Sequence, residues 1–259
     1  MKIKLFGIAA CIILLMLGCA QIAHQPKLQY KKYVGPNRTL VLLLPTIAGE
    51  GAHFEEHGFI EAVRERGFEV DMKILDIRPV LYLNDRIVGL IQTELVEPAK
   101  VSGYQKIILV GISLGGHGAL LYTASSPRDV DGVVVLAPFL GGFFIDGAIE
   151  EAGGLHQWQR CPMFEWPYAC EMWHLLKTHL SDPENRRKII IGYGTQDGFA
   201  ERNQLLADQL PAGNVFTVDG GHDWITWKLL WTHVLDYFHV SCGGPGHTTC
   251  LIEIEKVAY

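Results

Sequence analysis

Apolar residues occur along this chain in short continuous runs rather than in strict alternation with polar ones. Such runs are typical of strands in a parallel sheet that is buried on both faces. We expect six of them to be strands: Thr39–Leu44, Phe68–Leu75, Lys106–Val110, Gly132–Leu136, Lys188–Ile191 and Val215–Val218. The segments that we expect to be helices lie between and after them: His53–Arg66, Arg86–Val96, Gly115–Ser125, Ala200–Gln209 and Trp224–Phe238. This alternation predicts an α/β fold with a mostly parallel sheet and helices on both faces.

The segment from Phe139 to Pro183 interrupts the alternation, after the strand that ends near Leu136. It holds two adjacent glycines, a pair of cysteines and several aromatic residues: Trp158, Trp166, Tyr168 and Trp173. We therefore predict an insertion over about 139–183. Its aromatic side chains either contact an apolar ligand or pack the insertion onto the domain.

The amino-terminal segment has the features of an export signal. Lys2 and Lys4 precede the charge-free apolar run Leu5–Leu17, which has the length of a signal peptide and is short for a membrane span. The stretch Leu15–Ala20, which contains Cys19, resembles a bacterial lipobox, and this resemblance implies that Cys19 is lipidated.

We expect a signal peptide over 1–18, a lipidated cysteine with a polar tether over 19–38, and a folded domain over 39–259. The protein would then be exported and anchored to a membrane of the bacterial cell envelope, facing the periplasm. An ordinary signal peptide and an uncleaved anchor are the alternatives.

Composition narrows the class of protein. The chain has 259 residues, of which 49% are hydrophobic and 19% charged, values that suit a globular domain and argue against disorder. The formal net charge of −6 argues against nucleic acid as a partner. The oligomeric state is left open.

Four cysteines follow Cys19 along the chain: Cys161, Cys170, Cys242 and Cys250. An even number of cysteines in an exported protein indicates disulfides. Of the three possible connectivities, we expect Cys161–Cys170 with Cys242–Cys250, because these pairs close the shortest loops. No C-x-x-C spacing is present, which argues against a zinc site.

A G-x-S-x-G sequence, Gly111–Gly115, follows the apolar run Lys106–Val110 directly. A serine in a tight turn between a strand and a helix is held in a strained backbone conformation, and side chains two positions away would clash. Small residues after the turn let the following helix lie close to the sheet. We therefore expect Ser113 to be a nucleophile.

A serine hydroxyl needs a base, and the base needs a third group that orients it. His222 and Asp197 each lie in a loop after a predicted strand, and parallel strands bring such loops to the same sheet edge as Ser113. We expect His222 to be the base and Asp197 the orienting acid. Asp146 is an alternative acid, whereas Asp223 adjoins the histidine and more plausibly caps the last helix.

Two backbone N–H groups are needed to stabilise an oxyanion. We expect one from Leu114, which follows the nucleophile, and one from the loop after Thr39–Leu44. In that loop Ile47, or Thr46 beside it, would be the donor. Pro45 has no N–H and is excluded.

We expect structural roles for three other histidines. His117 lies one helical turn beyond Ser113 and is expected to pack beneath the turn. His53 and His57 match an H-x-x-E-H zinc pattern, but no third ligand is evident, and we expect no metal site.

The segments Gly111–Leu120 and Gly220–Lys228 resemble the nucleophile turn and the histidine segment of the esterase D-like esterases, and Thr39–His239 as a whole resembles the α/β-hydrolase superfamily. The resemblance implies the α/β-hydrolase fold, with the insertion as a cap over the active site. It also implies hydrolysis of a small carboxylic ester or thioester through an acyl-serine, without a cofactor. Relatives often carry His-Gly where this chain has Pro45-Thr46.

Three alternatives to an esterase stay open at this point. An acyltransferase and a serine peptidase would use the same three residues. A non-catalytic binding protein anchored in the envelope would keep only the hydrolase scaffold.

Overall fold

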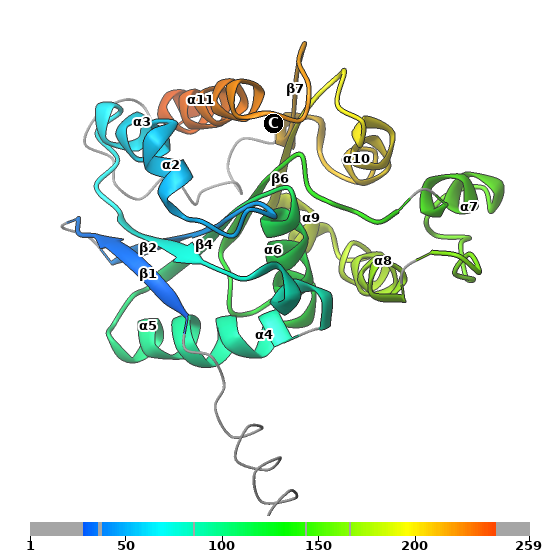
Figure 1. The fold of residues 1–259 in the computed structure, drawn as a ribbon, viewed down its shortest axis with the longest axis horizontal. Helices are drawn as coiled ribbons and strands as arrows, with labels where there is room; N and C mark the ends of the chain where they lie inside the picture. Colours follow the sequence, from blue (N-terminus) through cyan, green and yellow to red (C-terminus); the bar gives the residue numbers. More distant parts are fainter. Residues whose placement is uncertain (1–27, 36–37, 85, 143, 166, 242–259) are drawn as a thin grey trace, which may run out of the picture.

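A computed structural model describes residues 28–35, 38–84, 86–142, 144–165 and 167–241 of the chain. Within these ranges seven strands form one sheet in the order β1-β3-β2-β4-β5-β6-β7 (Figure 1). The strands are β1 (Gln29–Tyr33), β2 (Thr39–Leu44), β3 (Asp71–Asp76), β4 (Lys106–Ile112), β5 (Gly132–Leu136), β6 (Ile189–Gly194) and β7 (Val215–Val218). Six of them are parallel, and β1 pairs antiparallel with β3 at one edge. The α/β-hydrolase sheet predicted from the sequence is therefore confirmed.

Helices cover both faces of this sheet. They are α2 (Ala52–Glu56), α3 (Phe59–Glu65), α4 (Arg86–Leu90), α5 (Glu97–Val101), α6 (Leu114–Ser125), α7 (Ile145–Glu151), α8 (Pro167–His179), α9 (Pro183–Arg187), α10 (Ala200–Ala207) and α11 (Trp224–Ser241). Two 3₁₀ segments, η1 (Pro79–Asn84) and η3 (Ala212–Asn214), and a π-helical segment, η2 (Ile91–Val96), complete the order. In Figure 1, α2, α3 and α11 lie above the sheet, and α4, α5 and α6 lie below it. No helix in these ranges is both long enough and apolar enough to span a membrane.

The central strands are buried on both faces, as their continuous apolar runs require. Every residue of β2 and of β5 is buried. At roughly 25 cal/mol per Å² of apolar surface removed from water, burial of these strands between two helical layers is the main favourable contribution to folding. Because β2, β4, β6 and β7 run parallel, their carboxyl ends lie at one edge of the sheet.

The segment Gln29–Tyr33 corrects the prediction of a tether over 19–38, because it forms strand β1. Its sequence, Gln-Tyr-Lys-Lys-Tyr, is polar and mostly exposed, so it lacks the apolar run by which the other strands were found. Charged side chains on an edge strand also discourage pairing with another chain. The earlier part of the predicted tether, with the signal peptide and Cys19, lies outside the described residues.

Two predicted helices have different bounds. The expected helix His53–Arg66 is interrupted at Gly58, whose φ of 71° separates α2 from α3. The expected helix Arg86–Val96 continues through η2 into α5 and ends at Val101. Pro98 lies at the start of α5, and the wider π-helical turn before it accommodates a ring that would clash with a carbonyl in a regular α-helix.

The predicted insertion contains α7 and α8, which pack against α10 and α6 respectively. Trp158 and Trp173 are fully buried there, so the packing interpretation holds for both. Trp166 lies outside the described residues. That the insertion forms a cap stays a prediction.

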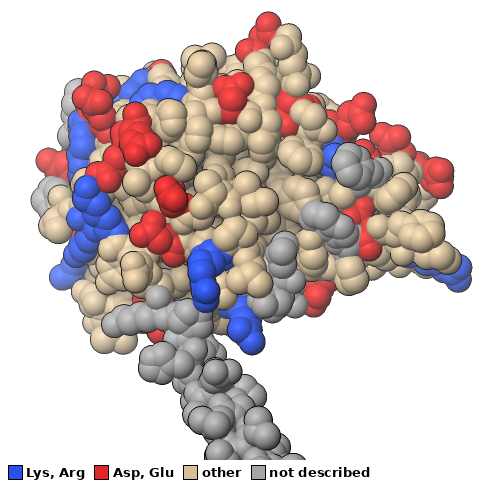
Figure 2. All heavy atoms as spheres, viewed as in Figure 1, with Lys and Arg blue, Asp and Glu red and all other residues tan. Residues whose placement is uncertain are grey.

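Charged side chains of both signs are spread over the molecule. On the face drawn in Figure 2, acidic side chains occur at the top, the left and the right, and basic side chains occur at the left, at the bottom and at the right tip.

Candidate active site

Ser113 occupies the turn between β4 and α6 in a conformation that few residues adopt. Its φ of 53° and ψ of −114° lie outside the regions favoured by side-chain-bearing residues. A Cβ on Gly111 would lie 2.4 Å from the carbonyl oxygen of Gly115, and a Cβ on Gly115 would lie 2.2 Å from that of Leu44. Both positions therefore require glycine, and the turn holds the serine out at the edge of the sheet.

The structure brings together the three side chains expected to act as a triad. His222 Nε2 lies 3.0 Å from Ser113 Oγ, and His222 Nδ1 lies 2.7 Å from Asp197 Oδ2. Asp197 follows β6, and His222 follows β7. The Asp197 side chain is fully buried, whereas that of His222 is 27% exposed. The serine and the imidazole are thus within hydrogen-bonding reach, with a buried carboxylate behind them.

Backbone contacts fix the acid loop against the histidine loop. Asp197 Oδ1 accepts a hydrogen bond from the Phe199 N–H at 2.8 Å, so both carboxylate oxygens are engaged. The Gln196 N–H donates to the Gly220 carbonyl at 2.9 Å. A Cβ on Gly194 would lie 2.2 Å from the same carbonyl oxygen, so the two loops touch at their backbones.

The two alternative acids serve elsewhere. Asp146 Oδ2 lies 3.4 Å from Arg202 Nη2 in a largely buried ion pair between α7 and α10. Asp223 Oδ1 accepts the Thr226 N–H at 2.9 Å and so caps the start of α11, as expected. Hydrogen bonds from Thr226 hold the pKa of the Asp223 carboxyl below its usual value.

Aromatic side chains flank the imidazole on two sides, which the sequence reasoning did not anticipate. Phe199 and Trp227 make edge contacts with His222, with ring centroids 5.0 and 4.9 Å away. Phe199 also contacts Phe139, the first residue of the insertion, at 5.6 Å. The only sequence signal for these neighbours was their short spacing from Asp197 and His222. These edge contacts limit the orientations that the imidazole can adopt.

Leu114 adjoins the nucleophile in the chain, and the loop after β2 approaches the serine turn at Gly115. Leu114 begins α6, where N–H groups have no partner within the helix, so its N–H is available to a ligand. In the loop after β2, the Thr46 side chain is buried and its Oγ1 accepts the Ala48 N–H at 3.3 Å. The Ile47 side chain is 68% exposed. The assignment of Ile47 or Thr46 as the second donor stays a prediction.

His117 is fully buried directly beneath the serine turn. Its backbone N–H donates to the Ser113 carbonyl at 3.1 Å, and its Nδ1 lies 3.2 Å from the Phe139 carbonyl. Burial lowers the pKa of His117 from 6.5 to about 4, although the hydrogen bond to Phe139 opposes this shift. His117 is therefore a neutral packing residue.

His53 and His57 both contact the ring of Trp224. No group of three potential metal ligands occurs within the part of the chain that the structure describes. His57 stacks on Trp224 with ring centroids 4.5 Å apart, and His53 makes an edge contact with the same ring. Both histidines pack against the start of α11.

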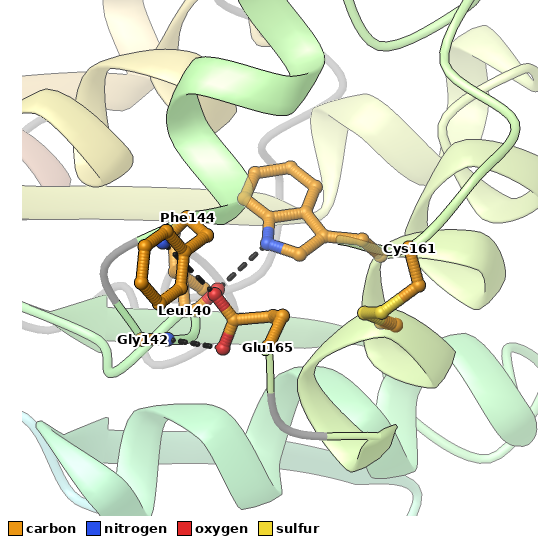
Figure 3. Close-up of a disulfide and its surroundings, with 7 residues drawn as sticks. Leu140, Gly142, Phe144, Cys161 and Glu165 are labelled. Atoms are coloured by element: carbon orange, nitrogen blue, oxygen red, sulfur yellow. Dashed lines mark hydrogen bonds between the residues drawn. A yellow bond between two sulfur atoms is a disulfide. The ribbon is translucent and has the colours of Figure 1, made fainter. Parts of the chain in front are cut away.

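Contacts within the insertion fix the segment after β5 (Figure 3), and the first residue of this segment, Phe139, donates its N–H to the Ser113 carbonyl at 2.9 Å. The buried Glu165 accepts the N–H groups of Gly142 and Phe144 at 2.7 and 3.2 Å, and Trp173 Nε1 donates to the Leu140 carbonyl at 2.7 Å. The predicted Cys161–Cys170 disulfide is present beside these contacts, with Cα atoms 5.7 Å apart. Cys242 and Cys250 lie outside the described residues.

Comparison with known proteins agrees with this geometry. The protein family described as "Putative esterase" matches residues 78–236, a range that contains the three triad positions but not the loop after β2. None of the curated proteins matches the chain significantly.

Solved α/β-hydrolase structures share the fold at low sequence identity. Est1E from Butyrivibrio proteoclasticus is 17% identical, with 84% of this chain and 96% of that one covered and a TM-score of 0.57. The fluorophosphonate-binding serine hydrolase FphF of Staphylococcus aureus is 16% identical over 83% and 94% of the two chains, with a TM-score of 0.53. MGS-MChE2, an α/β hydrolase from the metagenome of lagoon sediments at Mar Chica, Morocco, is 20% identical over 84% and 97%, with a TM-score of 0.51.

Proposed function

Because the chain belongs to this esterase family and is a carboxylesterase-like hydrolase, we propose that it cleaves carboxylic esters with Ser113, His222 and Asp197 as its catalytic triad. The observation that carries the proposal is the continuous hydrogen-bonded array from Ser113 Oγ through the imidazole to Asp197, with distances of 3.0 and 2.7 Å. The substrate would be a small-molecule ester or thioester.

In the acylation step Ser113 Oγ attacks the carbonyl carbon while its proton passes to His222 Nε2. The Asp197 carboxylate accepts the Nδ1–H, which keeps Nε2 free to take the proton and stabilises the imidazolium that forms. His222 then gives the proton to the departing alkoxide or thiolate, and the acyl group stays on Ser113. Water, deprotonated by the same imidazole, releases the acid and restores the serine.

Negative charge develops on the carbonyl oxygen in both steps, and we assign its stabilisation to the N–H groups of Leu114 and of Ile47 or Thr46. A proline removes a single backbone donor, so Ile47→Pro and Thr46→Pro separate the two candidates. The variant that removes the true donor should lower kcat by roughly 10²–10³ with little change in circular dichroism. Equal and small effects in both variants would contradict the assignment of the donor to this loop.

A fluorophosphonate probe tests the nucleophile directly, because it forms a covalent bond only with an activated serine. We expect labelling of the wild-type protein and none of Ser113→Ala. Ser181→Ala is a matched control, since Ser181 is exposed and its hydroxyl only donates to the Thr178 carbonyl. Labelling of Ser113→Ala at the wild-type level would refute the triad.

We also propose that the protein is exported and lipidated at Cys19, with residues 1–18 removed. The signal-like amino-terminal sequence supports this proposal, and so does the Cys161–Cys170 disulfide, since disulfides persist mainly outside the cytosol. Metabolic labelling with an alkynyl fatty acid should mark the wild-type protein and leave Cys19→Ala unmarked. Equal labelling of the two proteins, or no labelling of either, would count against lipidation at Cys19.

A further inference from the structure

A second pocket lies at the opposite end of the sheet from Ser113. It has a volume of about 450 Å³, within the range of small-molecule sites. Its lining residues come from β1, from the amino ends of β2 and β3 and from the end of α5; they include Tyr30, Lys32, Arg38, Asp71, Lys73 and Tyr104. The triad, by contrast, lies at the carboxyl ends of the strands. The proposed hydrolysis makes no use of this pocket.

Lys73 is the unusual residue of the pocket. It lies within β3 and is only 7% exposed, whereas buried lysines are normally paired with an acid. The ion pairs among the described residues do not include Lys73. Its Nζ lies 4.4 Å from the centre of the Tyr30 ring. A cation–π contact of this kind offsets only part of the cost of burying an ammonium group.

The neighbour of Lys73 on the adjacent strand is also a cation. In the antiparallel pairing of β1 with β3, Lys32 lies directly opposite Lys73. Like charges at directly opposed positions destabilise a sheet. Their presence on one face of an edge pair therefore points to a group that compensates them.

Among the described residues, Asp71 is the only acidic one that lines the pocket, and its charge is already balanced by Lys32. Its carboxylate lies 3.2 Å from Lys32 Nζ and accepts hydrogen bonds from the Tyr104 hydroxyl and the Gly35 N–H. Burial raises the pKa of Asp71, but these three partners outweigh burial and hold the pKa below its usual value. Asp71 thus stays ionised and balances Lys32, which leaves Lys73 and the exposed Arg38 without an acid in the pocket.

We propose that this pocket binds the phosphate group of an organic phosphate. The described residues that line it include three cations and one carboxylate, a surplus of two positive charges in a chain whose net charge is −6. That surplus matches a phosphate monoester dianion, which a guanidinium fork and an ammonium group recognise well. The volume exceeds what the phosphate needs, and the Tyr30 and Tyr104 rings offer a surface for the organic part.

Binding of glycerol 3-phosphate and of inorganic phosphate to the purified protein, measured by titration calorimetry, tests the proposal. We expect saturable binding that weakens by at least about tenfold in both Lys73→Met and Arg38→Gln. Lys31→Gln is the matched control, because Lys31 is next to Lys32 on β1 but pairs with Glu55 at 2.6 Å and does not line the pocket. It should bind like the wild type.

Two vesicle experiments distinguish a free phosphate from a phospholipid headgroup. If the ligand is a lipid, the protein should sediment with phosphatidylcholine vesicles that contain phosphatidic acid, but not with phosphatidylcholine alone, and Lys73→Met should abolish the difference. The absence of binding in every arm would overturn the proposal. Equal weakening by Lys31→Gln would overturn it as well, because it would indicate diffuse attraction between charges.

Two further measurements keep the test decisive. If Lys73→Met does not fold, the exposed position Arg38 decides the question through Arg38→Gln. Esterase activity should be unchanged in Lys73→Met and Arg38→Gln, because the triad lies at the other sheet edge. A failure of phosphate binding is therefore distinguishable from a failure of the proposed catalytic function.

Discussion

Replacement of His117 should change how the stability of the protein depends on pH. Burial lowers the pKa of this histidine to about 4 in the folded protein, whereas in the unfolded chain it has its ordinary value of 6.5. Between pH 6.5 and pH 4, His117 is therefore protonated in the unfolded chain but not in the folded protein. As a result, the free energy of unfolding falls as the pH decreases from about 6.5 to about 4. Above that window the histidine contributes no pH dependence.

The expected magnitude follows from the two pKa values. A difference of one pKa unit corresponds to about 1.4 kcal/mol, so the full effect of His117 is about 3 kcal/mol, of which about 2 kcal/mol develops between pH 7.5 and pH 5. His117→Asn removes the titration, and its amide can still donate to the Phe139 carbonyl. The asparagine side chain is smaller than the imidazole, so this variant will be less stable at every pH, but the loss of stability from the smaller volume is independent of pH.

Urea unfolding followed by tryptophan fluorescence at about pH 7.5 and pH 5 measures the difference. The free energy of unfolding of the wild type should fall by about 2 kcal/mol more than that of His117→Asn over this interval. The exposed His156, replaced by Asn, is the matched control and should lose stability like the wild type. The buried His179, whose pKa is also lowered to about 4, titrates equally in all three proteins and cancels. Equal losses in the wild type and His117→Asn would refute the reasoning.

Three further outcomes are expected. Asp197→Asn should lower kcat by roughly 10³–10⁴ because it favours the wrong imidazole tautomer, whereas Asp146→Asn should retain most of the activity; comparable losses in steady-state assays would contradict the choice of acid. Gly115→Ala should reduce both stability and activity, because its Cβ would lie 2.2 Å from a backbone oxygen, while Gly147→Ala, which meets nothing within 4 Å, should be tolerated in thermal melts. Cys170→Ser should destabilise the protein by about 2–3 kcal/mol in urea unfolding, since the disulfide closes a short loop; an unchanged midpoint would show that the bond contributes little.

The strands could be predicted to the extent that burial dictates their sequence. β2, β4 and β5 were evident because each is apolar on both faces, a pattern with few alternatives. β1 was not predicted, because it is an edge strand with exposed lysines and has no apolar run. Its stability comes from pairing with β3, and this pairing is not evident from the composition of β1 itself. The break at Gly58 could have been anticipated from the glycine, whereas the π-helical turn before Pro98 depends on how a helix continues past a proline.

The three side chains of the site could be predicted because their places follow from topology. Ser113, Asp197 and His222 each follow a parallel strand, and such strands end at one edge of the sheet. Their neighbours could not be predicted in this way. Phe199 and Trp227 contact the imidazole because of the conformation of the segments that follow Asp197 and His222. Asp146 instead forms an ion pair with Arg202, which lies far from it in the sequence. Contacts of this kind depend on tertiary packing rather than on strand order.

Glycines link the strand order to the local packing of the site, because they let the site loops touch at their backbones. Gly115 lies against the Leu44 carbonyl, which joins the serine turn to the loop after β2, and Gly194 lies against Gly220, which joins the acid loop to the histidine loop. A displacement of about 1 Å at reacting groups can cost roughly 10² in rate. Side chains at these contacts would push the loops apart by more than that distance, since each Cβ would stand 2.2 Å from an oxygen. The distances of 3.0 and 2.7 Å around His222 therefore depend on glycines that take no part in the chemistry.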